Sequence, residues 1–188
     1  MKKLMTHVVV GSPTLQVTRH LISEMIDRDI AAIELQIPFS DPIADGPVLM
    51  EANDRAVKNG VSVKEALSLM RPGKTKFYLM SYLQPILHYG PAAFFEQALQ
   101  AGCAGFIIPD LPFDAPETKQ FIAAKPELRH TLVPVLSSGM TKDRLQQLFA
   151  VLEPELVYLT PRHGITAART DFSQDLSTAI MLSRALSN

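Results

Sequence analysis

Short runs of apolar residues alternate along this chain with longer stretches in which apolar residues recur every three or four positions. A short apolar run predicts a buried strand, and the wider spacing predicts an amphipathic helix. The predicted strands cover residues 6–11, 31–38, 75–83, 104–111, 130–137 and 155–161. The predicted helices cover residues 13–28, 47–59 with 62–71, 90–101, 114–124, 141–152 and 172–186. This alternation indicates an α/β protein with a parallel sheet and helices outside it.

Two architectures are compatible with six such β–α units: an open doubly wound sheet, and a (β/α)8 barrel that lacks two units. The first β–α turn, VVVGSPTLQ, lacks the G-x-G-x-x-G fingerprint of a dinucleotide-binding fold. Polar residues instead gather where several predicted strands end, and barrel enzymes build their sites there. We therefore predict a single domain of TIM-barrel type over residues 1–188. The polar residues at the strand ends are Glu34, Gln36, Gln84, Asp110, Ser137, Tyr158 and Thr160.

Glu34 stands inside the predicted strand AAIELQIP. Side chains alternate along a strand, so Glu34 and Gln36 point to one face while Ile33, Leu35 and Ile37 point to the other. The aliphatic face suits the layer between sheet and helices, which leaves Glu34 facing the barrel lumen. A carboxyl group buried there has dedicated partners or a raised pKa, and a raised pKa suits a general acid/base near neutral pH. A structural glutamate, bonded to backbone or paired with an arginine, stays open as the alternative.

The segment PFSDPIADGP, residues 38–47, follows that strand. It is longer than the usual connection of about two to six residues, and long ordered loops often carry function. Asp41 is typical of a turn beside proline. Asp45, directly before the next predicted helix, is placed to direct a carboxylate into the mouth of the barrel.

Composition narrows the classes of function. The chain has 18 Lys and Arg against 19 Asp and Glu, so it has no basic field for nucleic acid or an anionic membrane. No stretch approaches the ~20 apolar residues of a membrane span, and we interpret MKKLMTHVVVGSP as a first strand and not as a secretory signal. The one cysteine, Cys103, forms no internal disulfide, which fits a cytoplasmic protein. The five histidines are scattered without metal-ligand spacing, so no metal site is predicted.

The segment ELQIPFSDPIADGPVLMEANDRAVKNGVS strongly resembles the signature of the tryptophan synthase α subunit family. The similarity continues, in the family's order, through LMSYLQPILHYG, AGFIIPDLP and VYLTPRHGIT. The resemblance implies a (β/α)8 barrel that cleaves indole-3-glycerol phosphate to indole and glyceraldehyde 3-phosphate. It also implies an α2β2 assembly in which the pyridoxal phosphate belongs to the β subunit, so no cofactor is expected in this chain.

The resemblance also assigns roles to individual residues. Glu34 falls on the family's acid/base, Asp45 on its second catalytic carboxylate, and Tyr158 on a tyrosine beside the substrate. Thr166 matches the lid threonine that meets the loop aspartate, and Ala167 occupies a phosphate-contact position. The residues that match regions touching the β subunit are Asp41, Pro42 and Gln84.

Three substitutions depart from the family pattern. Gln36 stands where the family usually has glycine, so its amide is expected either to hydrogen-bond Glu34 or to fill substrate space. Ala167 also replaces a glycine, and its N–H serves the phosphate only if the backbone suits a residue with a Cβ. Gln84 replaces the usual asparagine, which weakens the expected contact with the β subunit.

The largest departure is length, because the chain stops after the sixth predicted helix. The family continues with a seventh and an eighth strand, and barrels of this type bind phosphate with the loops after those strands. We therefore expect the 188-residue chain by itself to be nearly inactive toward indole-3-glycerol phosphate. Two further interpretations stay open. One is an impaired α-like barrel that binds and activates the β subunit, and the other is a lyase for a related indole or a smaller substrate without phosphate.

Overall fold

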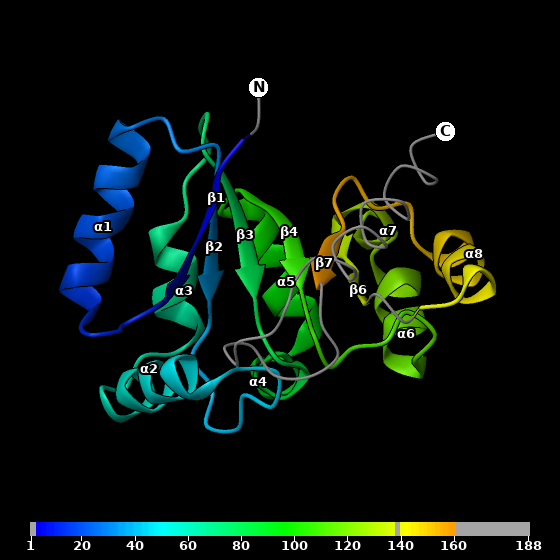
Figure 1. The fold of residues 1–188 in the computed structure, drawn as a ribbon, viewed down its shortest axis with the longest axis horizontal. Coiled ribbons are helices and arrows are strands. Elements are labelled where there is room, and N and C mark those ends of the chain that lie inside the picture. The colour runs from blue at the N-terminus through cyan, green and yellow to red at the C-terminus, as the bar shows by residue number, and fades with distance from the viewer. Residues whose placement is uncertain (1–2, 138–139, 161–188) are drawn as a thin grey trace, which may run out of the picture.

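Parallel strands in sequential order form the centre of the molecule. A computed structural model describes residues 3–137 and 140–160. Its first sheet contains β1 (Met5–Val9), β2 (Ala32–Gln36), β3 (Lys76–Met80), β4 (Cys103–Ile107) and β5 (Leu132–Val133), paired in that order (Figure 1). A second parallel pair follows, made of β6 (Val135–Ser137) and β7 (Tyr158–Thr160). Each strand therefore pairs with a neighbour in the sequence, as the strands of a barrel do.

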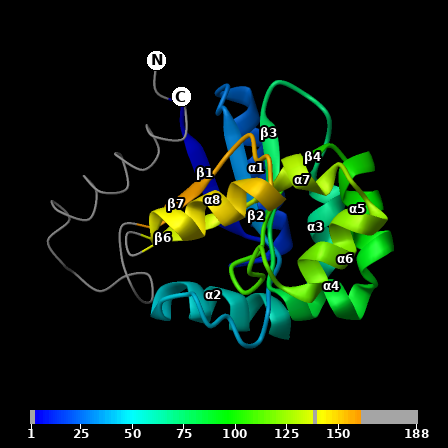
Figure 2. The same ribbon diagram turned by 90° about the vertical axis from the view of Figure 1, so that its right-hand side faces the viewer.

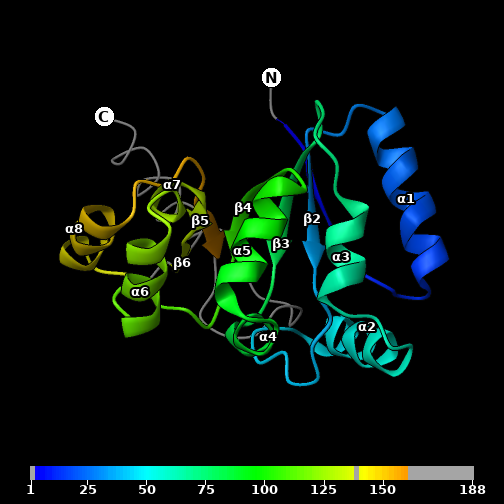
Figure 3. The ribbon, with the colours of Figure 1, turned by 180° about the vertical axis from the view of Figure 1, so that it is seen from behind.

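The helices lie on one side of these strands and beyond their carboxyl ends. α3 and α5 lie against the face seen in Figure 3, with α1 beside them. Figures 1 and 2 both place α2 and α4 past the carboxyl ends of the strands. No helix in the described ranges has the length and apolar character needed to cross a membrane. The bounds are α1 Leu15–Asp27, α2 Pro47–Lys58, α3 Val63–Leu69, α4 Leu83–Tyr89, α5 Pro91–Gln100, α6 Pro116–Ala124, α7 Leu128–Thr131 and α8 Lys142–Val151.

The two faces of the sheet bury different sets of side chains. The outer face carries Ile33, Leu35 and Leu79, which belong to the large core packed under the helices. The inner face carries a smaller apolar cluster that includes Tyr78 and Met80. Sequential strand order with helices on the outer face confirms the barrel-type prediction and excludes the doubly wound alternative.

Helix starts follow recognisable local chemistry. Thr141 caps α8, since its hydroxyl accepts a hydrogen bond from the Arg144 N–H at 3.2 Å. Ser62 and Glu65 form a capping box at α3, in which the Glu65 carboxylate accepts from the Ser62 N–H at 2.8 Å. These caps satisfy N–H groups that a helix leaves without an intrahelical partner.

The structure corrects two of the predicted elements. The prediction of one strand over residues 130–137 is wrong in two ways. The first residues of that segment belong to the helical turn α7. The strand is also interrupted at Pro134, because proline has no N–H to continue the hydrogen-bond ladder. The strand predicted over residues 75–83 ends at Met80, and the unpredicted helix α4 follows, placing Gln84 in a helix and not at a strand end. The Leu83 N–H at the start of α4 donates to Asp110 Oδ1 at 2.9 Å, a long-range contact that local patterns do not reveal. The helix predicted over residues 172–186 lies outside the described residues.

The outer core should respond strongly to loss of volume. Leu79 on β3 is fully buried, whereas Leu87 on α4 is 41% exposed. We expect Leu79→Ala to lower the free energy of unfolding by about 2–5 kcal/mol and Leu87→Ala to lower it by well under about 1 kcal/mol. Urea denaturation followed by circular dichroism measures both values. Equal losses in the two variants would contradict the assignment of Leu79 to the core.

Candidate active site

A cavity of about 510 Å³ opens on the inner face of the strands. Glu34 and Gln36 both line it, as the alternation along β2 predicts. The wall combines residues from β1, β2, the β2–α2 loop and β7, so the strands curve around a common space. The polar residues of this wall are His7, Glu34, Gln36, Asp45, Ser137, Tyr158 and Thr160.

Glu34 is a nearly buried carboxyl group without a strong ion-pair partner. Only 5% of its surface is exposed. Burial is the main cause that raises its pKa to about 7, and the negative charge of Asp45 adds to the effect. Among the described residues, its one ion-pair contact joins Oε1 to His7 Nε2 at 4.0 Å. Burial lowers the pKa of His7 below its usual value, so this histidine is neutral at neutral pH. The alternative of an arginine-paired structural glutamate therefore finds no support in the described part of the chain.

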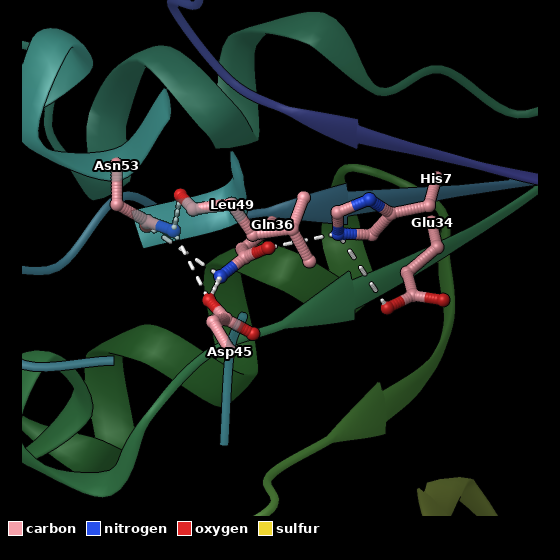
Figure 4. A network of polar contacts seen from close by, with 6 residues as sticks. All are labelled: His7, Glu34, Gln36, Asp45, Leu49 and Asn53. Atoms are coloured by element: carbon pink, nitrogen blue, oxygen red, sulfur yellow. Dashed lines mark hydrogen bonds and ion pairs between the residues drawn. The ribbon is translucent and has the colours of Figure 1, made fainter. Parts of the chain in front are cut away.

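Asp45 is held by two side-chain amides (Figure 4). Gln36 Nε2 donates to Asp45 Oδ2 at 2.6 Å, and Asn53 Nδ2 donates to the same oxygen at 3.1 Å. The other end of the Gln36 amide, Oε1, lies 2.8 Å from His7 Nε2. The expected hydrogen bond from Gln36 to Glu34 is thus replaced by bonds to Asp45 and His7. The carboxylate is 4% exposed, so these donors compensate for much of the water that it has lost.

The loop that carries Asp45 is anchored from two sides. Asn53, on α2, accepts the Phe39 N–H at 3.1 Å through Oδ1 and donates to the Leu49 carbonyl at 2.8 Å through Nδ2. The hydroxyl of the fully buried Tyr82 accepts the Ala44 N–H at 3.0 Å. Burial and the hydrogen bond with Asp45 both raise the pKa of Tyr82, so its phenol stays neutral. These contacts give a long loop a defined conformation.

Tyr158 reaches the same cavity from β7. Its ring is partly buried, and burial together with the negative charges of Glu34 and Asp45 raises its pKa. It is therefore a neutral hydroxyl in the wall of the cavity that the two carboxyl groups also line. The predicted site residues Thr166 and Ala167 lie outside the described residues.

Three predicted partner-contact residues lie outside the cavity wall. Asp41 and Gln84 are exposed, and the Ser40 hydroxyl donates to the Asp41 carboxylate. Pro42 is buried, and its carbonyl accepts the Asp45 N–H at 3.0 Å. Pro42 therefore shapes the loop from within, whereas Asp41 and Gln84 stay predictions for a contact with another chain.

His7, Asn53 and Tyr82 belong to the site but were not predicted from the sequence. His7 is paired in register with Glu34 across β1 and β2. The sequence signal that could have identified His7 is that it is a polar residue on the same strand face as Val9, two residues later. Asn53 shares a helix face with Leu49, one turn earlier, which marks it as a polar residue on a buried side. In the described ranges no group of three His, Cys, Asp or Glu side chains is placed to hold a metal ion.

The chain is similar in sequence to one family of known proteins. The family model described as tryptophan synthase alpha chain matches residues 1–188. A tryptophan synthase alpha chain from Petrotoga mobilis is 37% identical over 169 residues, covering 88% of this chain and 64% of the relative. One from Syntrophotalea carbinolica is 34% identical over 179 residues, covering 92% of this chain and 69% of the relative. The chain therefore spans about two thirds of the length of these relatives.

The chain is also similar in fold to solved structures of proteins with the same name. A crystal structure of tryptophan synthase from Mycobacterium tuberculosis superposes with a TM-score of 0.83 at 26% identity, over 99% of this chain and 71% of that chain. A tryptophan synthase alpha chain from Legionella pneumophila superposes with a TM-score of 0.77 at 26% identity, over 98% and 67%.

The raised pKa of Glu34 predicts a specific dependence of stability on pH. Between the ordinary value of 4.5 and the folded value of about 7, the folded chain keeps the Glu34 proton that the unfolded chain has lost. The free energy of unfolding should therefore fall as pH rises through this window, by up to about 3 kcal/mol from this group. Urea denaturation at pH 4.5 and 7.5 should show that Glu34→Gln removes this loss, while Glu96→Gln, at an exposed glutamate, retains it. Identical pH dependence in wild type and Glu34→Gln would contradict the assignment.

Proposed function

The chain belongs to the tryptophan synthase alpha chain family. From this membership and the site geometry we propose that the complete protein cleaves indole-3-glycerol phosphate to indole and glyceraldehyde 3-phosphate, a reaction that the 188-residue chain by itself is expected to carry out only weakly. The observation that carries the proposal is the pair Glu34 and Asp45. Both carboxyl groups line one cavity, but the pKa of Glu34 is raised to about 7 while Asp45 receives two amide N–H groups. Carboxyl groups in such unlike environments take unlike roles in catalysis.

The chemistry needs one proton placed on the ring and another removed from the side chain. Cleavage of the C–C bond requires a proton at C3 of the indole ring and loss of the proton from the glycerol hydroxyl next to the bond. Glu34 is suited to this proton transfer because its pKa of about 7 leaves both protonation states populated near neutral pH. The indole N–H becomes more acidic as the ring is protonated, and Asp45 is the group proposed to accept its hydrogen bond. Tyr158 would contact the substrate from the opposite wall.

The proposal extends to a partner and a compartment. As in the family, the indole would pass to a β subunit that holds pyridoxal phosphate, and this chain would need no cofactor of its own. The exposed Asp41 and Gln84 lie on the two segments proposed to touch that subunit. We propose a cytoplasmic location, which suits a biosynthetic enzyme with one unpaired cysteine. Phosphate contacts are assigned by resemblance to Thr166 and Ala167, outside the described residues.

A second function, activation of the β subunit without lyase activity, is favoured by one observation. Gln36 introduces a side chain next to Asp45 where the family usually has glycine, and that side chain occupies part of the space between the two carboxyl groups. A chain with a reduced cavity and an intact docking loop would still bind a partner. The exposed Ile43 and Val48, at 74% and 73%, leave the loop and the start of α2 free to make such a contact.

The lyase proposal predicts a large effect of removing either carboxylate. Glu34→Gln and Asp45→Asn should each lower the rate of indole release from indole-3-glycerol phosphate by about 10²–10⁴-fold, because each would remove a proton-transfer or hydrogen-bonding group from the transition state. Glu96→Gln is the matched control and should keep the wild-type rate. Indole release is measured with the β subunit present and absent. A loss below about tenfold in either variant would remove that residue from the proposed role.

The same assay separates the two functions. If the protein acts only as an activator, wild type and Glu34→Gln will release no indole but will stimulate the β-subunit reaction equally. Because the chain has no tryptophan, the fluorescence of an added indole ring can be followed without background from the protein. A titration with indole then reports whether the cavity binds the ring even where turnover is absent.

A further inference from the structure

Gln36 links Asp45 to His7, the histidine beside Glu34, through two hydrogen bonds. Its side chain is fully buried. Nε2 lies 2.6 Å from Asp45 Oδ2, and Oε1 lies 2.8 Å from His7 Nε2. His7 Nε2 in turn lies 4.0 Å from Glu34 Oε1, so the chain runs from Asp45 to the side of Glu34 (Figure 4).

The direction of every hydrogen bond in this chain is determined by groups that can only donate or only accept. The Phe39 backbone N–H donates to Asn53 Oδ1, and the Leu49 carbonyl accepts from Asn53 Nδ2, which fixes the Asn53 amide. Nδ2 of that amide also donates to Asp45 Oδ2, which marks this oxygen as an acceptor. Gln36 must therefore present Nε2 to Asp45, because the reversed amide would place two acceptor oxygens in contact.

The orientation of Gln36 decides the tautomer of His7. The amide oxygen Oε1 faces the imidazole and can only accept, so His7 Nε2 must carry the hydrogen. Burial keeps the ring neutral, so its other nitrogen, Nδ1, is the unprotonated one. The ring edge nearest to Glu34 is then an N–H group and not a lone pair.

We propose that Gln36 is a positioning residue that fixes His7 as the Nε2–H tautomer, so that the positive end of an N–H dipole, donated to Gln36 Oε1, lies 4.0 Å from Glu34 Oε1 whenever Asp45 is held in place. This inference rests on the proposed lyase function for its catalytic consequence, though not for the tautomer itself. A neutral N–H beside Glu34 favours the carboxylate that has just given up its proton, without supplying a full charge that would abolish the raised pKa. A lone pair at the same place would disfavour that carboxylate. The protonation cycle of Glu34 thus depends on a group bound to Asp45.

The test is side-chain NMR of the histidines in the 188-residue chain, with the His7 signals identified by their loss in His7→Asn. At a pH where His7 is neutral, the ring ¹⁵N and ¹³C shifts distinguish the two tautomers. Wild type should show one tautomer with hydrogen on Nε2. Gln36→Leu, which keeps the length but removes both hydrogen bonds, should give a mixture. Gln120→Leu, at an exposed glutamine of α6, is the matched control and should leave His7 unchanged.

A second variant keeps the test decisive if Gln36→Leu does not fold. Asp45→Ala removes the nearer acceptor of Gln36 Nε2, at 2.6 Å, and leaves only Asn53 Oδ1 at 3.5 Å. The His7 tautomer should therefore also become mixed, although Asp45 does not touch His7 in the network. Asp45→Asn should retain the Nε2–H tautomer, because an amide oxygen can replace Oδ2. A wild-type ring with hydrogen on Nδ1, or an unchanged ring in both Gln36→Leu and Asp45→Ala, would overturn the proposal.

Kinetics test the catalytic consequence separately. Gln36→Leu should lower kcat for indole release by about 10- to 100-fold with a smaller change in KM, as expected when a hydrogen bond to a charged group is lost. If Gln36 merely occupies ligand space, Gln36→Gly will raise kcat/KM and Gln36→Leu will leave kcat unchanged, which would contradict a positioning role. Because the 188-residue chain by itself is expected to be nearly inactive, a rate too low to measure leaves the catalytic consequence to the complete protein, and the NMR result alone then decides whether Gln36 sets the tautomer of His7.

Discussion

The hydrogen bond from Gln36 to Asp45 joins the end of β2 to the loop that follows it, and the arrangement of the whole site depends on this bond. Alternation along β2 places Gln36 and Glu34 on the inner face together. The loop then returns so that Asp45 meets the strand from which it departed. Asn53 and Tyr82 hold the loop from α2 and from the segment after β3, so elements distant in sequence converge on one carboxylate.

The two buried carboxyl groups have different surroundings. Glu34 lies among apolar residues of the inner face with a neutral histidine at 4.0 Å, and its pKa rises to about 7. Asp45 is equally buried but receives amide N–H groups that replace water around the carboxylate. The same barrel lumen therefore surrounds one carboxyl group with apolar residues and gives the other two amide donors, an asymmetry that suits unlike roles. A negative Asp45 also helps to keep Glu34 protonated, so the two environments reinforce each other.

Local patterns predicted much of this arrangement. The two-residue period in AIELQ placed Glu34 and Gln36 on the inner face and the aliphatic residues under the helices, and the structure agrees. The length of the loop after β2 predicted that Asp45 does more than form a turn, and that its carboxylate points into the mouth of the barrel. The alternation of elements predicted a parallel sheet, and the polar residues at the strand ends favoured the barrel over the doubly wound sheet; the sequential strand order agrees with the barrel.

What could not be predicted depends on contacts across the fold. The pairing of His7 with Gln36 joins β1 to β2, and its partner atoms lie 29 positions apart in the chain. The start of α4 is held by a hydrogen bond to Asp110, which belongs to the next β–α unit. Because this contact is not visible in the local sequence, the strand predicted over residues 75–83 extends too far. Gln36 was expected to act on Glu34 directly, yet tertiary packing brings Asp45 and His7 to the two ends of its amide. Periodicity determines which face a side chain occupies, whereas the choice among partners on that face is tertiary.

The central claim is that Glu34 holds its proton up to neutral pH inside the folded chain. The most direct measurement is a pH titration of the ¹³C shift of the Glu34 side-chain carboxyl in protein labelled at glutamate, with the signal assigned by its loss in Glu34→Gln. The account predicts a titration midpoint near pH 7. A midpoint near the ordinary glutamate value of 4.5 would contradict it.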